Sequence, residues 1–200
     1  WNKDRILVDP FCGSGTIPIE AAMIGANIAP GMNRSFTAEE WTHIIPKKAW
    51  YQVIEEANDN IREDVQLSIQ GYDMDGDIIK VARENARNAG VEEYIHFQQR
   101  PMQELRHPKK YGFIITNPPY GERLEDKADM PKLYKEIGET FGALDSWSYF
   151  LITGYEDAQK YIGKKATKNR KIYNGMMKTY FYQYMGPKPP KREKEQKEER

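Results

Sequence analysis

Four consecutive residues, Asn117-Pro118-Pro119-Tyr120, have the most specific chemistry in this sequence. The two prolines restrict the backbone, and the asparagine amide and the neighbouring carbonyl oxygens can accept hydrogen bonds. Such rigid acceptors can hold both N–H bonds of a planar amino group, so that the nitrogen lone pair faces an electrophile. Tyr120 adds a flat face on which a planar substrate can stack. Asn-Pro-Pro is also good turn chemistry, so the motif taken alone fits both interpretations.

A glycine-rich segment, Asp9-Pro-Phe-Cys-Gly-Ser-Gly-Thr16, is the second candidate motif. Gly13 and Gly15 allow a sharp bend and a close approach of the backbone to a ligand. The segment lacks the lysine of a P-loop and the third glycine of a dinucleotide fingerprint, so we do not expect a pyrophosphate ligand. No histidine lies beside Cys12 in the sequence, and we interpret this cysteine as a small packing residue rather than a nucleophile.

The segment from Asp9 to Thr16 resembles the first motif of S-adenosylmethionine-dependent methyltransferases, and Asn117 to Tyr120 resembles the fourth motif of those that methylate amino groups. The resemblance implies that the glycine loop wraps the methionine part of the cofactor. It also implies a catalytic role for Asn117, Pro118, Pro119 and Tyr120, with no strong base because the proton can leave after the new bond has formed. The cofactor-binding residues implied in this way are Asp9, Pro10, Phe11, Cys12, Gly13, Ser14, Gly15, Thr16, Asp73, Met74, Met102 and Asn117.

Asp73 stands where this family has an acidic residue that binds the ribose hydroxyls, at the end of the second predicted strand. A carboxylate that accepts two hydroxyl protons is physically suited to that role. The alternative is that Asp73 and Asp75 cap the next helix, which we expect for Asp75. After the third strand the sequence Gln98 to Met102 departs from the family pattern, so we assign adenine recognition to backbone groups near Met102.

The remaining pattern indicates the elements that position these motifs. Apolar runs predict strands at residues 5–9, 68–73, 94–98, 111–116 and 147–153, with helical spacing between them. Thr16 is the predicted N-cap of the first helix, and Gly25 and Gly90 are predicted helix stops. Two last strands, 170–173 and 176–182, flank Asn174-Gly175, a strong hairpin signal. We therefore predict an α/β, Rossmann-like fold with a mostly parallel seven-stranded sheet that ends in an antiparallel hairpin, and both motifs facing a common cavity.

Residues 27–66 interrupt this alternation as an insertion, irregular to residue 46 and then helical over 47–66. The stretch from Glu20 to Phe36, Trp41, and the run from Asn117 to Leu124 look like ribosomal-RNA large-subunit guanine-N2 methyltransferases, a group often labelled adenine-specific DNA methylases. The resemblance covers residues 1 to about 186, the predicted catalytic domain. A THUMP-type RNA-binding domain precedes it in that group, and the abrupt start at Trp1 suggests a fragment of such a protein.

The resemblance implies methylation of an exocyclic amino group of a base, with guanine N2 in 23S ribosomal RNA as the first choice. The fourth motif alone also fits adenine N6 in DNA and the amide of protein glutamine, and a catalytically idle RNA-binding module is a further alternative. A base in a duplex must leave its stack to reach the cofactor, which requires a stacking face and cationic guides. The candidate substrate-binding residues are Arg34, Phe36, Tyr120 and Arg123.

Composition limits the class of protein. The net charge is zero, but residues 1–157 carry 17 basic and 26 acidic residues, whereas residues 158–192 carry ten basic and none acidic. This basic block, with Lys164, Lys165, Lys168, Arg170 and Lys171, fits either a polyanion partner such as ribosomal RNA or a solvated surface. We interpret alternating Tyr180, Tyr182 and Tyr184 as sheet packing. Residues 187–200 are a predicted disordered tail.

The chain contains one cysteine and three scattered histidines. This pattern excludes an internal disulfide framework and gives no metal-ligand spacing, so we expect no metal and a reducing, cytoplasmic setting. The longest apolar runs are strand-sized and far shorter than the ~20 residues of a membrane span. The sequence leaves the oligomeric state open.

Overall fold

A seven-stranded sheet with the strand order β3-β2-β1-β4-β5-β7-β6 forms the centre of the molecule. The computed structural model describes residues 1–121 and 128–190. Strands β1 to β5 are parallel, β7 runs antiparallel to β5, and β6 runs antiparallel to β7. The predicted fold class is confirmed. The strands are β1 (Leu7–Asp9), β2 (Ile69–Asp73), β3 (Ile95–Gln99), β4 (Phe113–Thr116), β5 (Ser148–Thr153), β6 (Lys168–Asn174) and β7 (Met177–Tyr184).

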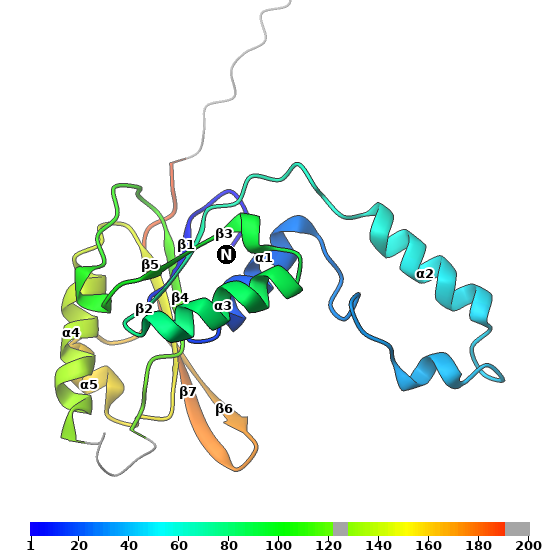
Figure 1. The fold of residues 1–200 in the computed structure, drawn as a ribbon. Coiled ribbons are helices and arrows are strands. Elements are labelled where there is room, and N and C mark those ends of the chain that lie inside the picture. The colour runs from blue at the N-terminus through cyan, green and yellow to red at the C-terminus, as the bar shows by residue number, and fades with distance from the viewer. Residues whose placement is uncertain (122–127, 191–200) are drawn as a thin grey trace, which may run out of the picture.

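Helices cover both faces of the sheet (Figure 1). Helices α1 (Thr16–Ala26) and α3 (Gly76–Asn88) pack on one face, and α4 (Met130–Gly142) and α5 (Ala158–Ile162) on the other. A hydrophobic core lies on each face of the sheet, and the side chains of residues 6–8 alternate between these two cores. Leu7 packs with α1 and α3, whereas Ile6 and Val8 pack with α4 and α5. The alternation is the period of two that a strand buried on both faces requires.

The ends of α1 differ from the prediction. Thr16 does not cap the helix; Gly15 occupies the N-cap position with φ 89°, and no side chain of the described residues caps it. The helix also continues past Gly25 and ends at Asn27, whose φ is 57°. An added Cβ at Gly25 would lie 2.7 Å from the Leu67 side chain, so this glycine allows close packing rather than a helix stop.

Other local predictions agree with the structure. Asp75 caps α3 by accepting a hydrogen bond of 2.8 Å from the backbone N–H of Asp77. Gly90 follows the last turn of α3 with φ 72°. In the hairpin, Tyr184 is buried and stacks on Tyr149 with ring centroids 4.4 Å apart, as expected for sheet packing.

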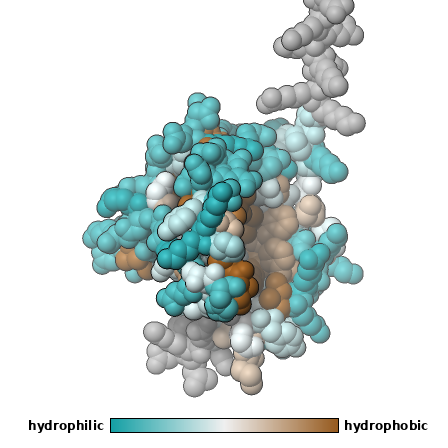
Figure 2. Space-filling model, turned by 90° about the vertical axis from the view of Figure 1, so that its right-hand side faces the viewer, coloured by the Kyte–Doolittle hydropathy of each residue, from teal (hydrophilic) through white to brown (hydrophobic). Residues whose placement is uncertain are grey.

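The insertion, residues 27–66, projects from the body as an extended arm (Figure 1). The arm contains η1 (Thr37–Glu40) and α2 (Lys47–Asp59), so its helix ends seven residues before the predicted end at residue 66. All residues of α2 are described, and none of them is buried. Figure 2 views the molecule from the side on which the arm projects and shows a band of hydrophobic side chains between hydrophilic regions.

The described residues contain two further short helices, η2 (Glu92–Tyr94) and η3 (Met102–Glu104). None of the helices in this part of the chain is long and apolar enough to cross a membrane. Within residues 1–121 and 128–190, no group of three His, Cys, Asp or Glu side chains is placed to hold a metal ion. Residues 191–200, most of the predicted tail, lie outside the described residues.

Candidate active site

The carboxyl ends of β1, β2 and β4 meet at one edge of the sheet because these strands are parallel neighbours. Both sequence motifs lie directly after these ends. A cavity of about 740 Å³ opens there. We call it the active-site cavity, and it is lined by Pro10, Phe11, Asp73, Met74, Pro101, Met102, Gln103, Asn117, Pro118, Pro119, Tyr120, Gly121, Asp129, Met130 and Leu133. The glycine loop and the double-proline turn therefore contribute to one common cavity.

The side chain of Asp9 connects the two motifs by hydrogen bonds. Its carboxylate accepts hydrogen bonds from the Thr116 hydroxyl at 2.6 Å and from the backbone N–H of Phe11 at 3.1 Å. Thr116 directly precedes Asn117, so one buried side chain holds the first loop against the turn after β4. Burial raises the pKa of Asp9 to about 7, because the charged form loses its hydration, and the negative charge of Asp73 adds to the shift.

Asp73 is fixed at the end of β2 by two backbone donors. Its Oδ2 accepts from the N–H of Gly13 at 3.1 Å, and its Oδ1 accepts from the N–H of Asp75 at 3.0 Å. An ionised carboxylate has about four acceptor positions, so two of them are used for this orientation and others stay available on the cavity side. The contact with Gly13 also holds the glycine loop beside the carboxylate.

Two other residues of the glycine loop are packing residues. Cys12 is buried, and burial raises the pKa of its thiol above the ordinary value. The thiolate that a nucleophile requires is therefore disfavoured, in agreement with the interpretation from the sequence. An added Cβ at Gly15 would lie 3.1 Å from Cζ of Phe97, so this glycine lets α1 approach the sheet. Neither residue lines the cavity.

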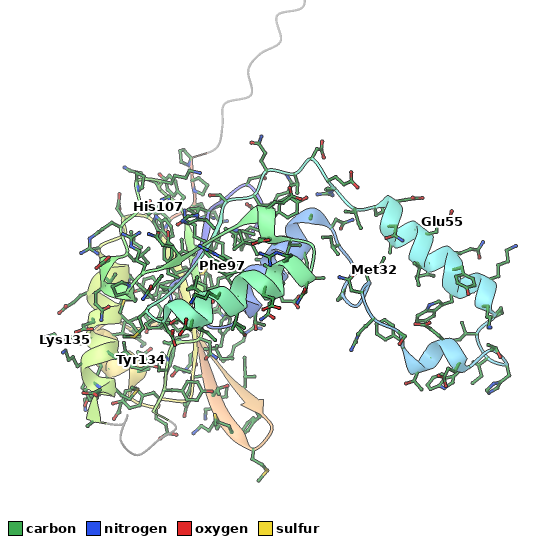
Figure 3. All side chains as sticks on the ribbon, viewed as in Figure 1. Met32, Glu55, Phe97, His107, Tyr134 and Lys135 are labelled. Atoms are coloured by element: carbon green, nitrogen blue, oxygen red, sulfur yellow. The ribbon has the colours of Figure 1, made fainter. Side chains whose placement is uncertain are left out.

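The turn after β4 is held by a chain of hydrogen bonds from β5. The backbone N–H of Tyr155 donates to Oγ1 of Thr153 at 3.0 Å. Oγ1 of Thr153 bonds the hydroxyl of Tyr134, which donates to the Pro119 carbonyl at 3.1 Å. Tyr134 is fully buried on the sheet side of α4, whereas the next residue, Lys135, points outward (Figure 3). These hydrogen bonds fix the double-proline turn relative to the end of β5.

Comparisons with known proteins identify the family of this arrangement. A family model described as RMKL-like, methyltransferase domain, matches residues 1–183. The chain belongs to this RMKL-like family. The resemblance of the two motifs to methyltransferase motifs is thereby confirmed at the level of the family.

Relatives of the RMKL-like chain agree with that assignment. It is 44% identical over 194 residues to the putative RNA methyltransferase YpsC of Bacillus subtilis, covering 97% of this chain and 50% of the relative. It is 37% identical over 183 residues to the ribosomal RNA large subunit methyltransferase K/L of Shewanella baltica, covering 89% and 26%. The chain thus spans half the length of the first relative and about a quarter of the second.

A solved structure places a ligand in a relative of this RMKL-like domain. The crystal structure of SMU.472, a putative methyltransferase complexed with SAH, has a TM-score of 0.89 and 45% identity, covering 95% of this chain and 50% of that one. SAH is what remains of S-adenosylmethionine after its methyl group has left. The family and this neighbour agree with the cofactor that the motifs imply.

Several predicted residues lie away from the lining of the cavity. Arg34 and Phe36 belong to the arm, where the guanidinium lies 4.5 Å from the centroid of the Phe36 ring and that ring packs at 5.9 Å from Trp50. The arginine thus braces the arm in this structure. Ser14 and Thr16 are exposed at the start of α1 and do not line the cavity either. Arg123 lies outside the described residues.

The RMKL-like structure also adds residues that the sequence did not indicate. Asp129, Met130 and Leu133 close the cavity from the first turn of α4. Nothing in the sequence indicated that the start of this helix would face the site. No sequence pattern indicated a role for Tyr134, because its hydrogen-bond partner Pro119 is fifteen residues away and only the fold brings the two residues together.

Proposed function

We propose that the chain is the catalytic domain of an S-adenosylmethionine-dependent methyltransferase that methylates guanine N2 in large-subunit ribosomal RNA. The observation that carries the proposal is the common cavity, in which the ribose-binding candidate Asp73 and the catalytic turn from Asn117 to Tyr120 line the same space. The relatives support RNA, and specifically ribosomal RNA, as the substrate, since one is a putative RNA methyltransferase and the other a ribosomal RNA large subunit methyltransferase.

The residues of the cavity fit the proposed cofactor. Asp73 offers acceptor positions for two ribose hydroxyls, and its bonds to the N–H groups of Gly13 and Asp75 fix its direction. Met74, Pro101 and Met102 supply apolar surface beside it, as an adenine ring requires. Pro10 and Phe11 line the cavity on the glycine-loop side. When bound, S-adenosylmethionine supplies an electrophilic methyl group.

The catalytic turn is suited to hold the acceptor amino group. The amide oxygen of Asn117 and the carbonyl oxygen of Pro118 can accept the two N–H bonds, which turns the nitrogen lone pair toward the cofactor. Tyr134 binds the Pro119 carbonyl, so the turn is fixed before the substrate arrives. Tyr120 offers its ring to the flipped base.

The experiment that tests the proposal identifies the methylated nucleoside. The full-length protein is incubated with isotope-labelled S-adenosylmethionine and ribosomal RNA from a strain that lacks its gene, and the digested nucleosides are analysed by mass spectrometry. We expect labelled N2-methylguanosine. A parallel reaction contains duplex DNA in place of the RNA. Labelled N6-methyladenine from either substrate would contradict the base assignment. Donor binding with no transfer to any of these substrates would indicate an idle RNA-binding module instead.

Two asparagine variants, one in the catalytic turn and one in the arm, distinguish an effect on the chemical step from an effect on folding. We expect Asn117→Ala to lower turnover about 100- to 1000-fold, the usual cost of losing one positioned polar group in a transition state. Its affinity for the donor, measured by calorimetry, should stay near that of the wild type. Asn58→Ala changes an exposed residue of α2 in the arm and serves as the matched control. Near-normal turnover of the Asn117 variant would refute the mechanism.

A further inference from the structure

A second cavity adjoins the active-site cavity on the far side of the catalytic turn. Its volume is about 420 Å³, and Tyr120 and Gly121 line both cavities. The rest of its wall comes from the segment that follows β5 and from Met177 at the start of β7. Its remaining lining residues are Gly154, Tyr155, Glu156 and Asp157. A base that stacks on Tyr120 with its amino group at Asn117 therefore has its ring next to this second cavity.

The wall of the second cavity is held at a fixed place relative to the catalytic turn. The hydrogen bonds from Tyr155 through Thr153 and Tyr134 end at the Pro119 carbonyl. An added Cβ at Gly154 would lie 3.0 Å from Cδ2 of Tyr120, so the Tyr120 ring lies close against the backbone there. Glu156 follows within two residues of this contact, and its position is therefore coupled to that of the stacking face.

The Glu156 carboxylate is held as an ionised acceptor. Its Oε1 accepts from Nζ of Lys178 at 3.0 Å and from the Tyr180 hydroxyl at 3.3 Å. The hydrogen bond from Lys178 keeps the pKa of Glu156 below its ordinary value. An ionised carboxylate accepts hydrogen bonds and donates none. The Glu156 side chain is 73% exposed and lines the second cavity, so its carboxylate can accept a hydrogen bond from a donor group of a bound base.

Guanine and adenine differ at the ring position beside the amino group. In guanine, the N2 amino group is flanked by N1–H, a donor, whereas in adenine the N6 amino group is flanked by N1 without a hydrogen, an acceptor. An acceptor that faces a carboxylate is left without a partner and is repelled. Sites built to bind one hydrogen-bond donor strongly reject analogues that lack it.

We propose that the second cavity receives the N1 side of the target base, beside the amino group held at Asn117, and that Glu156 selects guanine by accepting a hydrogen bond from N1–H. The proposal rests on the proposed function, because it assumes transfer to guanine N2. It adds a residue outside both sequence motifs and explains how a turn that suits several amino groups acts on one of them. The Lys178 and Tyr180 contacts hold the carboxylate in place for this purpose.

The test uses 2-aminopurine, which keeps the amino group at the same ring position but has no hydrogen on N1. The methylated position is first mapped by mass spectrometry of RNA fragments. The full-length protein is then assayed on synthetic RNA fragments that carry either guanine or 2-aminopurine at that position. We expect the wild type to prefer guanine about 10- to 100-fold in kcat/KM. Glu156→Gln should reduce that preference at least about 10-fold, because the amide can donate to an N1 without hydrogen.

The matched control is Glu139→Gln. Glu139 pairs with Lys135 on the outside of α4 and lines neither cavity, so its neutralisation should leave the preference for guanine unchanged. An unchanged preference in Glu156→Gln, while the wild type still forms N2-methylguanosine, would overturn the role of Glu156 and leave the proposed function intact. An equal loss in both variants would also overturn it. A wild type that forms no N2-methylguanosine overturns the proposed function itself.

Discussion

The carboxyl edge of the sheet and the arm differ in how their side chains are held. At the sheet edge, Asp9 binds Thr116 across 107 positions of the sequence, and Asp73 binds Gly13 across 60. In the arm, the Phe36 backbone N–H binds Glu39, three residues away, and Arg34 covers the Phe36 ring. Bonds between distant strands therefore fix the geometry of the active-site cavity, whereas the contacts of Phe36 stay within the arm.

The difference indicates which substitutions should disturb parts of the structure beyond their own neighbours. A substitution at the sheet edge disturbs several strands because each side chain there connects two or more of them. A substitution in the arm disturbs its own neighbours, since α2 contributes nothing to the two cores of the body. Stability and donor binding should consequently depend on the sheet, and the arm should have little influence on either.

Two phenylalanines test this contrast with the largest expected effect. Phe97 is 3% exposed in the core between the sheet, α1 and α3, and Figure 3 shows it inside the body. We expect Phe97→Ala to lower the free energy of unfolding by about 3–5 kcal/mol. Phe36→Ala in the arm should cost about 1 kcal/mol or less. Denaturant unfolding measures both values, and equal costs would refute the contrast.

The long-range bonds of Asp9 predict a pH dependence of stability. The pKa of Asp9 is about 7 in the folded protein and 3.8 in a reference state. Between these values the folded protein holds a proton that the unfolded chain has released, so stability falls as pH rises through this window. The shift corresponds to at most about 4 kcal/mol. Asp9→Asn should flatten the decline between pH 5 and 7 in equilibrium unfolding experiments.

The control for this prediction is Asp77→Asn. Asp77 is exposed and its hydrogen bond with Lys80 lowers its pKa, so this carboxylate is already ionised throughout the window from pH 5 to 7. Its replacement should leave the slope of stability against pH unchanged. A wild type whose stability stays constant from pH 5 to 7 would show that the buried Asp9 does not take up the proton.

Substitution of Asp73 should have the next smaller effect, a loss of affinity for the methyl donor. Asp73→Asn keeps the size of the side chain and removes the charge that makes it a strong acceptor for hydroxyl groups. We expect the affinity for S-adenosylmethionine, measured by calorimetry, to fall about 10- to 100-fold. Asp77→Asn, four residues further on and outside the cavity, should leave the affinity unchanged. Equal affinities of wild type and Asp73→Asn would remove this residue from the site.

The sequence predicted the sheet and the two motifs because their signals are local. Apolar runs separated by helical spacing define parallel strands, and Asn174-Gly175 defines the hairpin turn within a few residues. The cap at Asp75 depends on a bond to a residue two positions away. For the same reason the glycine loop and the double-proline turn were recognisable as motifs, and the rule for parallel strands placed them at one edge.

Features that depend on contacts between distant segments were not predictable. Gly25 has the sequence signature of a helix stop, and only its contact with Leu67 shows that it serves close packing. The arm helix was predicted too long because residues 60–66 keep some polar helix formers, although the chain turns back at Asn60, whose carbonyl accepts from Asn27. The role of Tyr134 likewise depends on three elements meeting at one hydroxyl group.

Tyr134 gives the smallest effect and the finest test of the contrast between the two regions. Tyr134→Phe keeps the ring in the core and removes the hydroxyl that joins Thr153 to the Pro119 carbonyl. The loss of the neutral hydrogen bond to the Pro119 carbonyl corresponds to about 0.5–1.5 kcal/mol, or about a 2- to 12-fold decrease in kcat. Because the hydroxyl touches the catalytic turn and no residue near Asp73, donor affinity should stay unchanged. Tyr51→Phe removes the same group from exposed α2 and should alter neither quantity. A parallel loss of donor affinity and kcat in Tyr134→Phe would mean that this tyrosine supports the whole cavity rather than the orientation of the turn.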